Sequence, residues 1–171
     1  FDQSPFNDVD NVILSQLAYV NFRDVIPSVQ MNKGITLKAA AQLFFDLHTE
    51  EELMQDKSFI KDAPKLLKKA AQTNRFRDVI LSDYVDMVDE TLEKQFGAFH
   101  IKLSPQCTYV AFRGTDDTLV GWKEDFNMSF ISPVPSQEDA VKYLDDTCSY
   151  IRGKLYVGGH SKGGYLAIYS A

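Results

Sequence analysis

The segment from Leu155 to Ile168 constrains the fold most, because two apolar runs stand on either side of a glycine-rich turn. The first run, Leu155-Tyr156-Val157, has the length of a strand, and the second, which starts at Tyr165, continues as a predicted helix. Four glycines between Gly158 and Gly164 predict a sharp turn between the two. A strand that enters a helix through such a turn is typical of α/β proteins, so we expect that fold class.

Within this turn, Ser161 lies between Gly159 and Gly163 in the pattern Gly-x-Ser-x-Gly. A serine on a strained strand-to-helix turn exposes its hydroxyl at the edge of a sheet, where it can attack a carbonyl. The two glycines are expected because side chains at their positions would collide across the turn. The backbone N–H of Lys162 would lie at a helix N-terminus, where partial positive charge stabilises an oxyanion. We therefore interpret Ser161 as a candidate catalytic nucleophile and Gly159 and Gly163 as its elbow.

Two other interpretations of this turn stay open. A glycine-rich turn can hold a buried or helix-capping serine with no catalytic role. A phosphate-binding loop is a poorer match, because Gly-His-Ser-Lys-Gly-Gly lacks the spacing of the Gly-x4-Gly-Lys-Ser/Thr motif.

A second candidate element follows the apolar run Thr108 to Phe112, which has the continuous hydrophobicity of a strand covered on both faces. Arg113-Gly114-Thr115 ends this run. A strand-end loop supplies the second oxyanion donor beside such an elbow, and Thr115 offers a backbone N–H and a hydroxyl. The alternative for this loop is an ordinary turn that caps the next helix. With the serine motif also present, we favour Thr115 and Lys162 as an oxyanion hole.

The rest of the sequence divides into a helical first part and a mixed second part. Apolar residues first recur at helical spacing and then alternate with polar residues, as in half-buried strands. We expect one domain over residues 1–171, with N-terminal helices followed by a central, mostly parallel sheet. The expected helices are 9–22, 37–54, 63–71, 118–126 and 136–150, and the expected strands 79–87 and 99–103 are joined by a hairpin.

Composition excludes several classes of partner. A net charge of -6 and a pI near 5.0 argue against a clustered basic face, so we expect no nucleic-acid partner. No apolar stretch approaches the roughly 20 residues of a membrane span, and no leader pattern opens the sequence, which favours a cytoplasmic protein. Cys107 and Cys148 are expected to be buried free thiols. Three scattered histidines form no metal pattern, and we expect neither a metal nor another cofactor.

These motifs together resemble the class 3 lipase branch of the α/β-hydrolases. The resemblance is carried by Phe112 to Thr115, Trp122, Asp125 and Gly159 to Gly164, and is strongest to bacterial lipase-like proteins with Gly-His-Ser-Lys-Gly-Gly at the elbow. Leu14 to Tyr19 also resembles the first helix of that group. The resemblance implies an α/β-hydrolase fold and hydrolysis of a small-molecule or lipid ester at Ser161. It also implies oxyanion donors at Thr115 and Lys162.

The sequence departs from that family in its proton-transfer residues. The family has its acid and its histidine far downstream of the serine, yet only ten residues follow Ser161. We therefore expect this chain to be the N-terminal part of the domain, nearly inactive by itself. His160 is expected to diverge from its neighbour, and His100 and His48 to be solvated. The alternatives are a catalytically inactive hydrolase-like binding protein, or a thioesterase or peptidase with the same elbow.

Two further features have plain interpretations. Trp122 and Asp125 share one face of the short helix over 118–126, where we expect a packing tryptophan and a surface or loop-anchoring carboxylate. The Lys162 side chain either biases the site towards anionic acyl substrates or is simply solvated.

Overall fold

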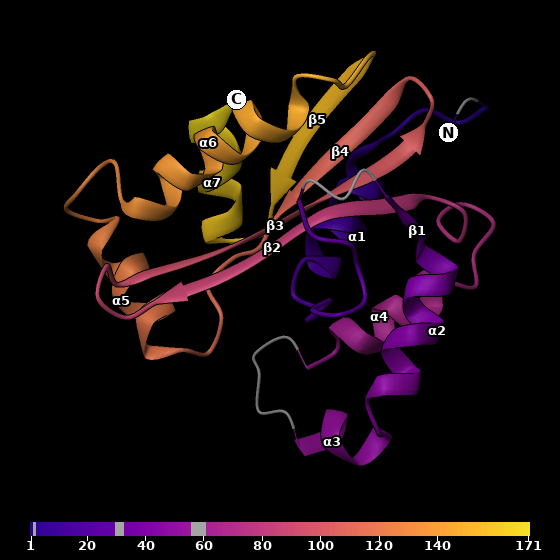
Figure 1. Ribbon diagram of the computed structural model, residues 1–171, viewed down its shortest axis with the longest axis horizontal. Helices are drawn as coiled ribbons and strands as arrows, with labels where there is room; N and C mark the ends of the chain where they lie inside the picture. The colour runs from indigo at the N-terminus through magenta and orange to yellow at the C-terminus, as the bar shows by residue number, and fades with distance from the viewer. Residues whose placement is uncertain (2, 30–32, 56–60) are drawn as a thin grey trace.

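The computed structural model describes residues 1, 3–29, 33–55 and 61–171. In these residues, five strands form one sheet and seven helices surround it, which makes the fold mixed α/β (Figure 1). The strands are β1 (Ile35–Thr36), β2 (Ile80–Asp89), β3 (Lys94–Ser104), β4 (Cys107–Phe112) and β5 (Lys154–Gly159). The helices are α1 (Asp8–Leu17), α2 (Leu37–Leu47), α3 (Glu50–Gln55), α4 (Ala63–Ala70), α5 (Leu119–Asn127), α6 (Pro135–Cys148) and α7 (Lys162–Ser170).

The sheet is mostly antiparallel, which corrects the expectation of a mostly parallel one. Its strands follow chain order from β1 to β5, and only β4 and β5 pair in parallel. The reason lies in the connections. A hairpin joins β2 to β3 and a two-residue turn joins β3 to β4, and such short links allow only antiparallel neighbours. The connection from β4 to β5 is long enough to hold α5 and α6, and it returns the chain in parallel.

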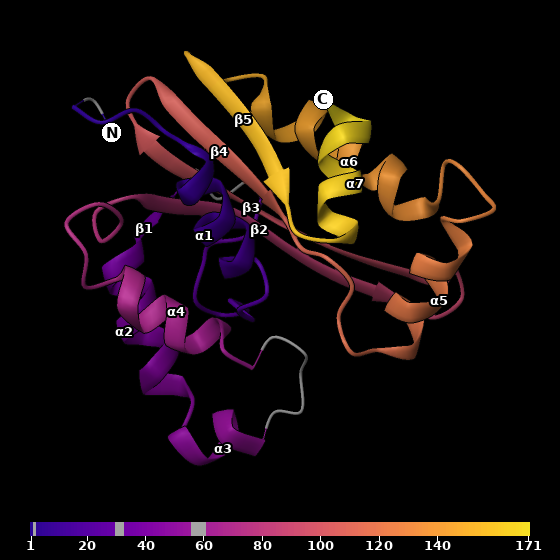
Figure 2. The ribbon, with the colours of Figure 1, turned by 180° about the vertical axis from the view of Figure 1, so that it is seen from behind.

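The sheet separates two hydrophobic cores. Helices α1, α2 and α4 pack on one face, while α6 and α7 pack on the other (Figures 1 and 2). The first core includes Leu14, Leu37, Phe44, Leu67, Phe99, Ile101 and Tyr109. The second includes Phe96, Val110, Phe112, Ala140, Tyr143 and Leu166. Neighbouring residues of β4 therefore point into different cores, which explains why its apolar run is continuous and confirms that both faces are covered.

The N-terminal helices form where the periodicity predicts them but are shorter. Helix α1 ends at Leu17 instead of reaching residue 22, and the predicted helix 37–54 is divided into α2 and α3. Thr49 and Glu52 exchange side-chain and backbone hydrogen bonds at the start of α3, so a new capping box interrupts the predicted helix. None of the described helices is both long enough and apolar enough to cross a bilayer.

The prediction of a solvated His100 is wrong. Its side chain points towards α6 and is buried, with Nε2 2.9 Å from the Thr147 hydroxyl. The alternating pattern of β3 suggested a polar outer face, but α6 covers that face, so a polar residue there needs a partner. Cys107 and Cys148 are free, as predicted, although both are half-buried and not fully buried.

Candidate functional site

The glycine-rich turn between β5 and α7 places Ser161 at the point where the strand becomes a helix (Figure 2). Its backbone has φ 55° and ψ −126°, and the side chain is exposed. A positive φ is unfavourable for a residue with a Cβ, and non-glycine residues in such conformations are concentrated at functional sites. The turn thus presents a strained, exposed serine at the carboxyl end of β5.

Close backbone contacts explain the two glycines of the turn. A Cβ on Gly159 would lie 2.4 Å from the Gly163 carbonyl carbon, across the turn. A Cβ on Gly163 would lie 2.3 Å from the Phe112 carbonyl oxygen at the end of β4. The first contact is the collision that the motif predicts. The second fixes the start of α7 against the neighbouring strand, so the turn is held from two sides.

Lys162 contributes its backbone and its side chain to different parts of the molecule. Its N–H belongs to the first turn of α7, where amides have no intrahelical acceptor and point out of the helix end beside Ser161. Its side chain is fully buried, and Nζ lies 2.8 Å from Glu124 Oε2. The expectation of a solvated side chain is therefore wrong, because the ammonium is buried against Glu124. A lysine side chain is usually exposed, but this turn directs the Lys162 side chain into the protein.

The loop from β4 to α5 lies against the elbow. A Cβ on Gly114 would lie 2.4 Å from the His160 carbonyl oxygen, so the two segments are in backbone contact. The next residue, Thr115, has a buried hydroxyl oxygen with no hydrogen-bond partner in the described structure. Buried polar atoms are nearly always hydrogen-bonded, and an exception calls for an explanation such as a ligand. An acceptor atom of a bound molecule would satisfy this hydroxyl.

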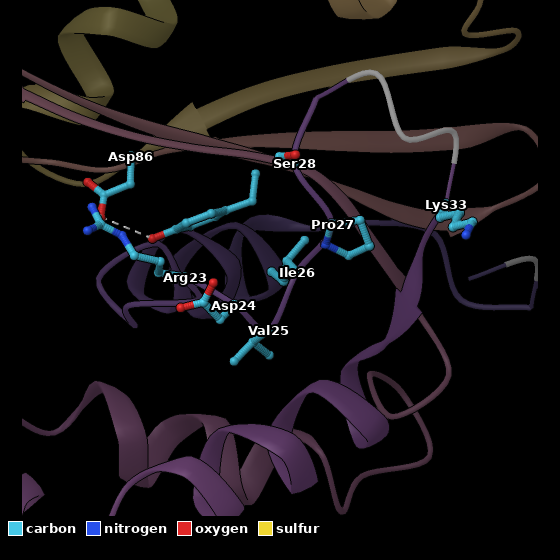
Figure 3. Close-up of a pocket in the computed structure, with 9 residues that line it drawn as sticks. Arg23, Asp24, Val25, Ile26, Pro27, Ser28, Lys33 and Asp86 are labelled. Atoms are coloured by element: carbon cyan, nitrogen blue, oxygen red, sulfur yellow. Dashed lines mark hydrogen bonds and ion pairs between the residues drawn. The ribbon is translucent and has the colours of Figure 1, made fainter.

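Arg113 anchors the same loop to the sheet. Its guanidinium pairs with the Asp86 carboxylate of β2, and its backbone N–H donates to the Gly97 carbonyl at 2.8 Å. The Asp86 carboxylate raises the pKa of Arg113 against the opposing effect of burial. Asp86 also lines a surface hollow of about 450 Å³, together with Arg23 (Figure 3). This hollow adjoins the anchor of the loop and does not include Ser161.

Tyr19, just after α1, reaches the elbow from the opposite end of the chain. Its hydroxyl lies 3.0 Å from His160 Nδ1 and donates to the His160 carbonyl oxygen at 3.4 Å. The pKa of Tyr19 is raised to about 12, mainly by burial, with Arg113 lowering it and the Asp125 and Asp116 carboxylates raising it. The hydroxyl is therefore protonated at neutral pH and can serve as a donor.

The three histidines are placed away from the Ser161 hydroxyl or are bonded elsewhere. His160 contacts Tyr19, and the His48 ring packs on Phe44. His100 contacts Thr147 of α6. In the part of the chain that the structure describes, none of them forms a hydrogen bond with Ser161. These contacts give no described histidine the position of a general base.

Sequence reasoning missed three residues of this region: Tyr19, Asp86 and Glu124. Tyr19 drew attention only as part of a resembling helix, and its contact with residue 160 spans most of the chain. Glu124 stands in the charged run Lys123-Glu124-Asp125, where only burial distinguishes it from its neighbours. Trp122 and Asp125, which the sequence placed on one helix face, are half-exposed and partly buried, respectively.

The model of one protein family, Mbeg1-like, matches residues 70–171, which include both the Thr115 loop and the elbow. This match covers more than half of the chain, and the chain belongs to the Mbeg1-like family. No curated protein and no solved structure is significantly similar to it. The expected membership of the class 3 lipases is therefore wrong. The strongest part of the resemblance, Gly159 to Gly164, contains the glycines that a tight strand-to-helix turn requires, and such a local requirement does not distinguish one family from another.

Proposed function

We propose that this protein is a serine hydrolase that cleaves carboxylic esters through an acyl-enzyme intermediate on Ser161. The observation that carries the proposal is the backbone of Ser161, a non-glycine residue at φ 55° on an exposed strand-to-helix turn. A strained backbone at this position is explained if the serine hydroxyl must project away from both β5 and α7. A merely capping serine has no need of it, and the Ser161 side chain makes no capping hydrogen bond to α7.

The proposed reaction is acyl transfer in two steps. The Ser161 oxygen attacks the ester carbonyl, its proton passes to a base, and the alkoxide leaves as an alcohol after accepting that proton. Water then attacks the acyl-serine and releases the carboxylic acid. The oxyanion of each tetrahedral intermediate would accept hydrogen bonds from the Lys162 N–H and from Thr115. The unpaired Thr115 hydroxyl supports this role, because it lacks an acceptor that an oxyanion would supply.

The general base and its acid partner are proposed to come from residues outside these 171. This part of the proposal rests on the contacts of His48, His100 and His160, which are made to other residues, with no hydrogen bond to the Ser161 hydroxyl in the described structure. Without a base, the serine hydroxyl is a weak nucleophile at neutral pH.

The fold that we propose around the elbow is of the α/β-hydrolase type. The parallel pair β4 and β5, with α5 and α6 between them in sequence and α7 after the elbow, supports this proposal. The antiparallel strands β1 to β3 would then form one side of a larger sheet.

Charge favours an uncharged ester as the substrate. Glu124 neutralises the Lys162 ammonium, and Asp86 pairs with the Arg113 guanidinium, whose effect on the pKa of Tyr19 is larger than that of either nearby carboxylate. The Asp125 and Asp116 carboxylates also act on Tyr19 and raise its pKa. Negative charge near the site repels anionic acyl groups. We therefore propose neutral small-molecule or lipid esters. An acetate ester of 4-nitrophenol should be cleaved faster than the corresponding succinate half-ester.

A fluorophosphonate probe tests the nucleophile in the protein at its full natural length. The wild type and a Ser170→Ala control, altered at the far end of the same helix, should be labelled equally. Ser161→Ala should not be labelled. Equal labelling of Ser161→Ala and the wild type would refute the assignment. Comparison of ester, thioester and amide substrates then distinguishes an esterase from a thioesterase or a peptidase.

A further inference from the structure

A buried ion pair connects the residue after Ser161 to the helix that follows the Thr115 loop. Lys162 Nζ donates to Glu124 Oε2 at 2.8 Å, to the Gln95 carbonyl at 2.6 Å and to Gln95 Oε1 at 2.8 Å. The Lys162 and Glu124 side chains are 0% and 1% exposed, respectively. Three acceptors use all three hydrogens of an ammonium group. The lysine therefore has a single, fully specified position.

The Glu124 carboxylate is equally occupied and joins further elements. Its Oε2 also accepts from the Gln95 N–H at 3.0 Å, and its Oε1 accepts from the Ser136 N–H at 3.0 Å. Gln95 lies near the start of β3, and Ser136 lies in the first turn of α6. One carboxylate on α5 thus links β3, α6 and the start of α7.

Fold stability alone does not account for such a pair. Removing two charges from water costs about as much as their attraction returns, and apolar residues of similar volume often stabilise a protein equally well or better. Here the Glu124 carboxylate also accepts the Gln95 and Ser136 N–H groups, but an uncharged glutamine oxygen could accept such hydrogen bonds. A lysine and a glutamate are better explained by the geometry that they fix.

Helix α5 transmits that geometry to the Thr115 loop. Asp116 Oδ1 accepts the Thr118 N–H at 3.0 Å, which ties the loop to the residue that caps α5. A Cβ on Gly121 would lie 2.7 Å from the same carboxylate oxygen, so the helix rests directly on the loop. A displacement of α5 would move Thr115 and, through Glu124, also Lys162.

We propose that Glu124 and Lys162 are positioning residues that hold the Lys162 N–H and the Thr115 loop at a fixed separation around Ser161. The inference rests on the proposed function, because it assigns both groups to one oxyanion hole. Small errors in such a site are costly, since a displacement of about 1 Å can slow a reaction a hundredfold. The buried ion pair supports the Lys162 N–H and the Thr115 loop from inside the protein and does not contact the substrate.

The test replaces the pair in the protein at its full natural length with the double variant Lys162→Met/Glu124→Leu. The variant leaves the Gln95 and Ser136 N–H groups without an acceptor, so we expect a folded protein with a free energy of unfolding below that of the wild type. Labelling of Ser161 by the fluorophosphonate should be about tenfold slower, with the affinity of the preceding non-covalent complex unchanged. Amide hydrogen exchange over residues 158–165 should be about tenfold faster. The matched control is Lys123→Met/Glu93→Leu, an exposed pair that also involves α5, which should change none of these.

Each outcome decides one question. Unchanged labelling and unchanged exchange in a folded double variant would make the pair merely structural and overturn the inference. Wild-type protein that is labelled no faster than Ser161→Ala would refute the proposed function instead, and the exchange measurement would then decide the positioning role. If the double variant does not fold, Glu124→Gln, which keeps the shape and removes the charge, should show the same changes in labelling and exchange.

Discussion

The Arg113 guanidinium and the Asp86 carboxylate form a buried pair that joins the loop after β4 to β2, with 9% and 10% of their side chains exposed. Removal of one partner from a buried pair leaves an uncompensated charge. We expect Asp86→Ala to lower the free energy of unfolding by about 3 kcal/mol, as measured by urea denaturation. The control is Asp62→Ala, which breaks an ion pair with Lys65 at the surface and should leave the denaturation midpoint unchanged. Similar midpoints for both variants would contradict this account.

The strain at Ser161 can be measured with a pair of substitutions. Glycine adopts positive φ freely, whereas alanine does not, so Ser161→Gly should raise the free energy of unfolding by about 1 kcal/mol relative to Ser161→Ala. Both variants lack the hydroxyl and should be equally unreactive towards the fluorophosphonate. Thermal and urea denaturation of the two proteins provide the comparison. Equal stability would mean that the serine conformation carries no strain.

Two adjacent glycines at the start of α7 should respond differently to alanine. The Cβ of Gly163→Ala would meet the Phe112 carbonyl at 2.3 Å and force β4 and α7 apart. We expect a loss of about 2 to 3 kcal/mol in the free energy of unfolding. The Cβ of Gly164→Ala would lie 3.3 Å from the Gly159 carbonyl oxygen, which a shift of a few tenths of an ångström relieves, so we expect a clearly smaller loss than for Gly163→Ala. A tolerated Gly163→Ala would show that the helix is free to move away from β4.

His100 should make stability depend on pH on the acidic side. Burial lowers the pKa of His100 below 6.5, while the Asp83 carboxylate opposes that shift. The unfolded chain therefore binds more protons than the folded one as the pH falls below 6.5, and stability decreases in that range. The urea midpoint should fall between about pH 7.5 and about pH 5, and less so in His100→Gln. The same pH dependence in both proteins would assign the effect to other groups.

Local patterns in the sequence predicted much of the fold. The alternation around Leu81 and Ile101 located the β2–β3 hairpin, and the continuous run to Phe112 indicated a strand between two layers. The order and direction of the strands depended on connection lengths, which periodicity does not show. The partners of Glu124 and His100 were hidden for a related reason, since a buried polar residue has the same sequence pattern as an exposed one until its neighbours are known.

The candidate site likewise contains residues that the sequence predicts and residues that only the tertiary structure shows. Ser161, Gly159 and Gly163 could be proposed from the sequence because they are neighbours along the chain, and the requirements of a tight turn are local. Tyr19, Asp86 and Glu124 reach the region from three other elements. No spacing rule connects them to Ser161, and only tertiary structure brings them together.

The hydrogen bond between Tyr19 and His160 joins residues 141 positions apart. During synthesis, which runs from the N-terminus, the helix before Tyr19 leaves the ribosome long before the residues that it must meet. The hydrogen bond between Tyr19 and His160 can form only after β5 has paired with β4. This corner of the molecule therefore cannot be completed before residue 160 has been synthesised, and a chain truncated before residue 154 would leave the Tyr19 hydroxyl without His160 as its partner.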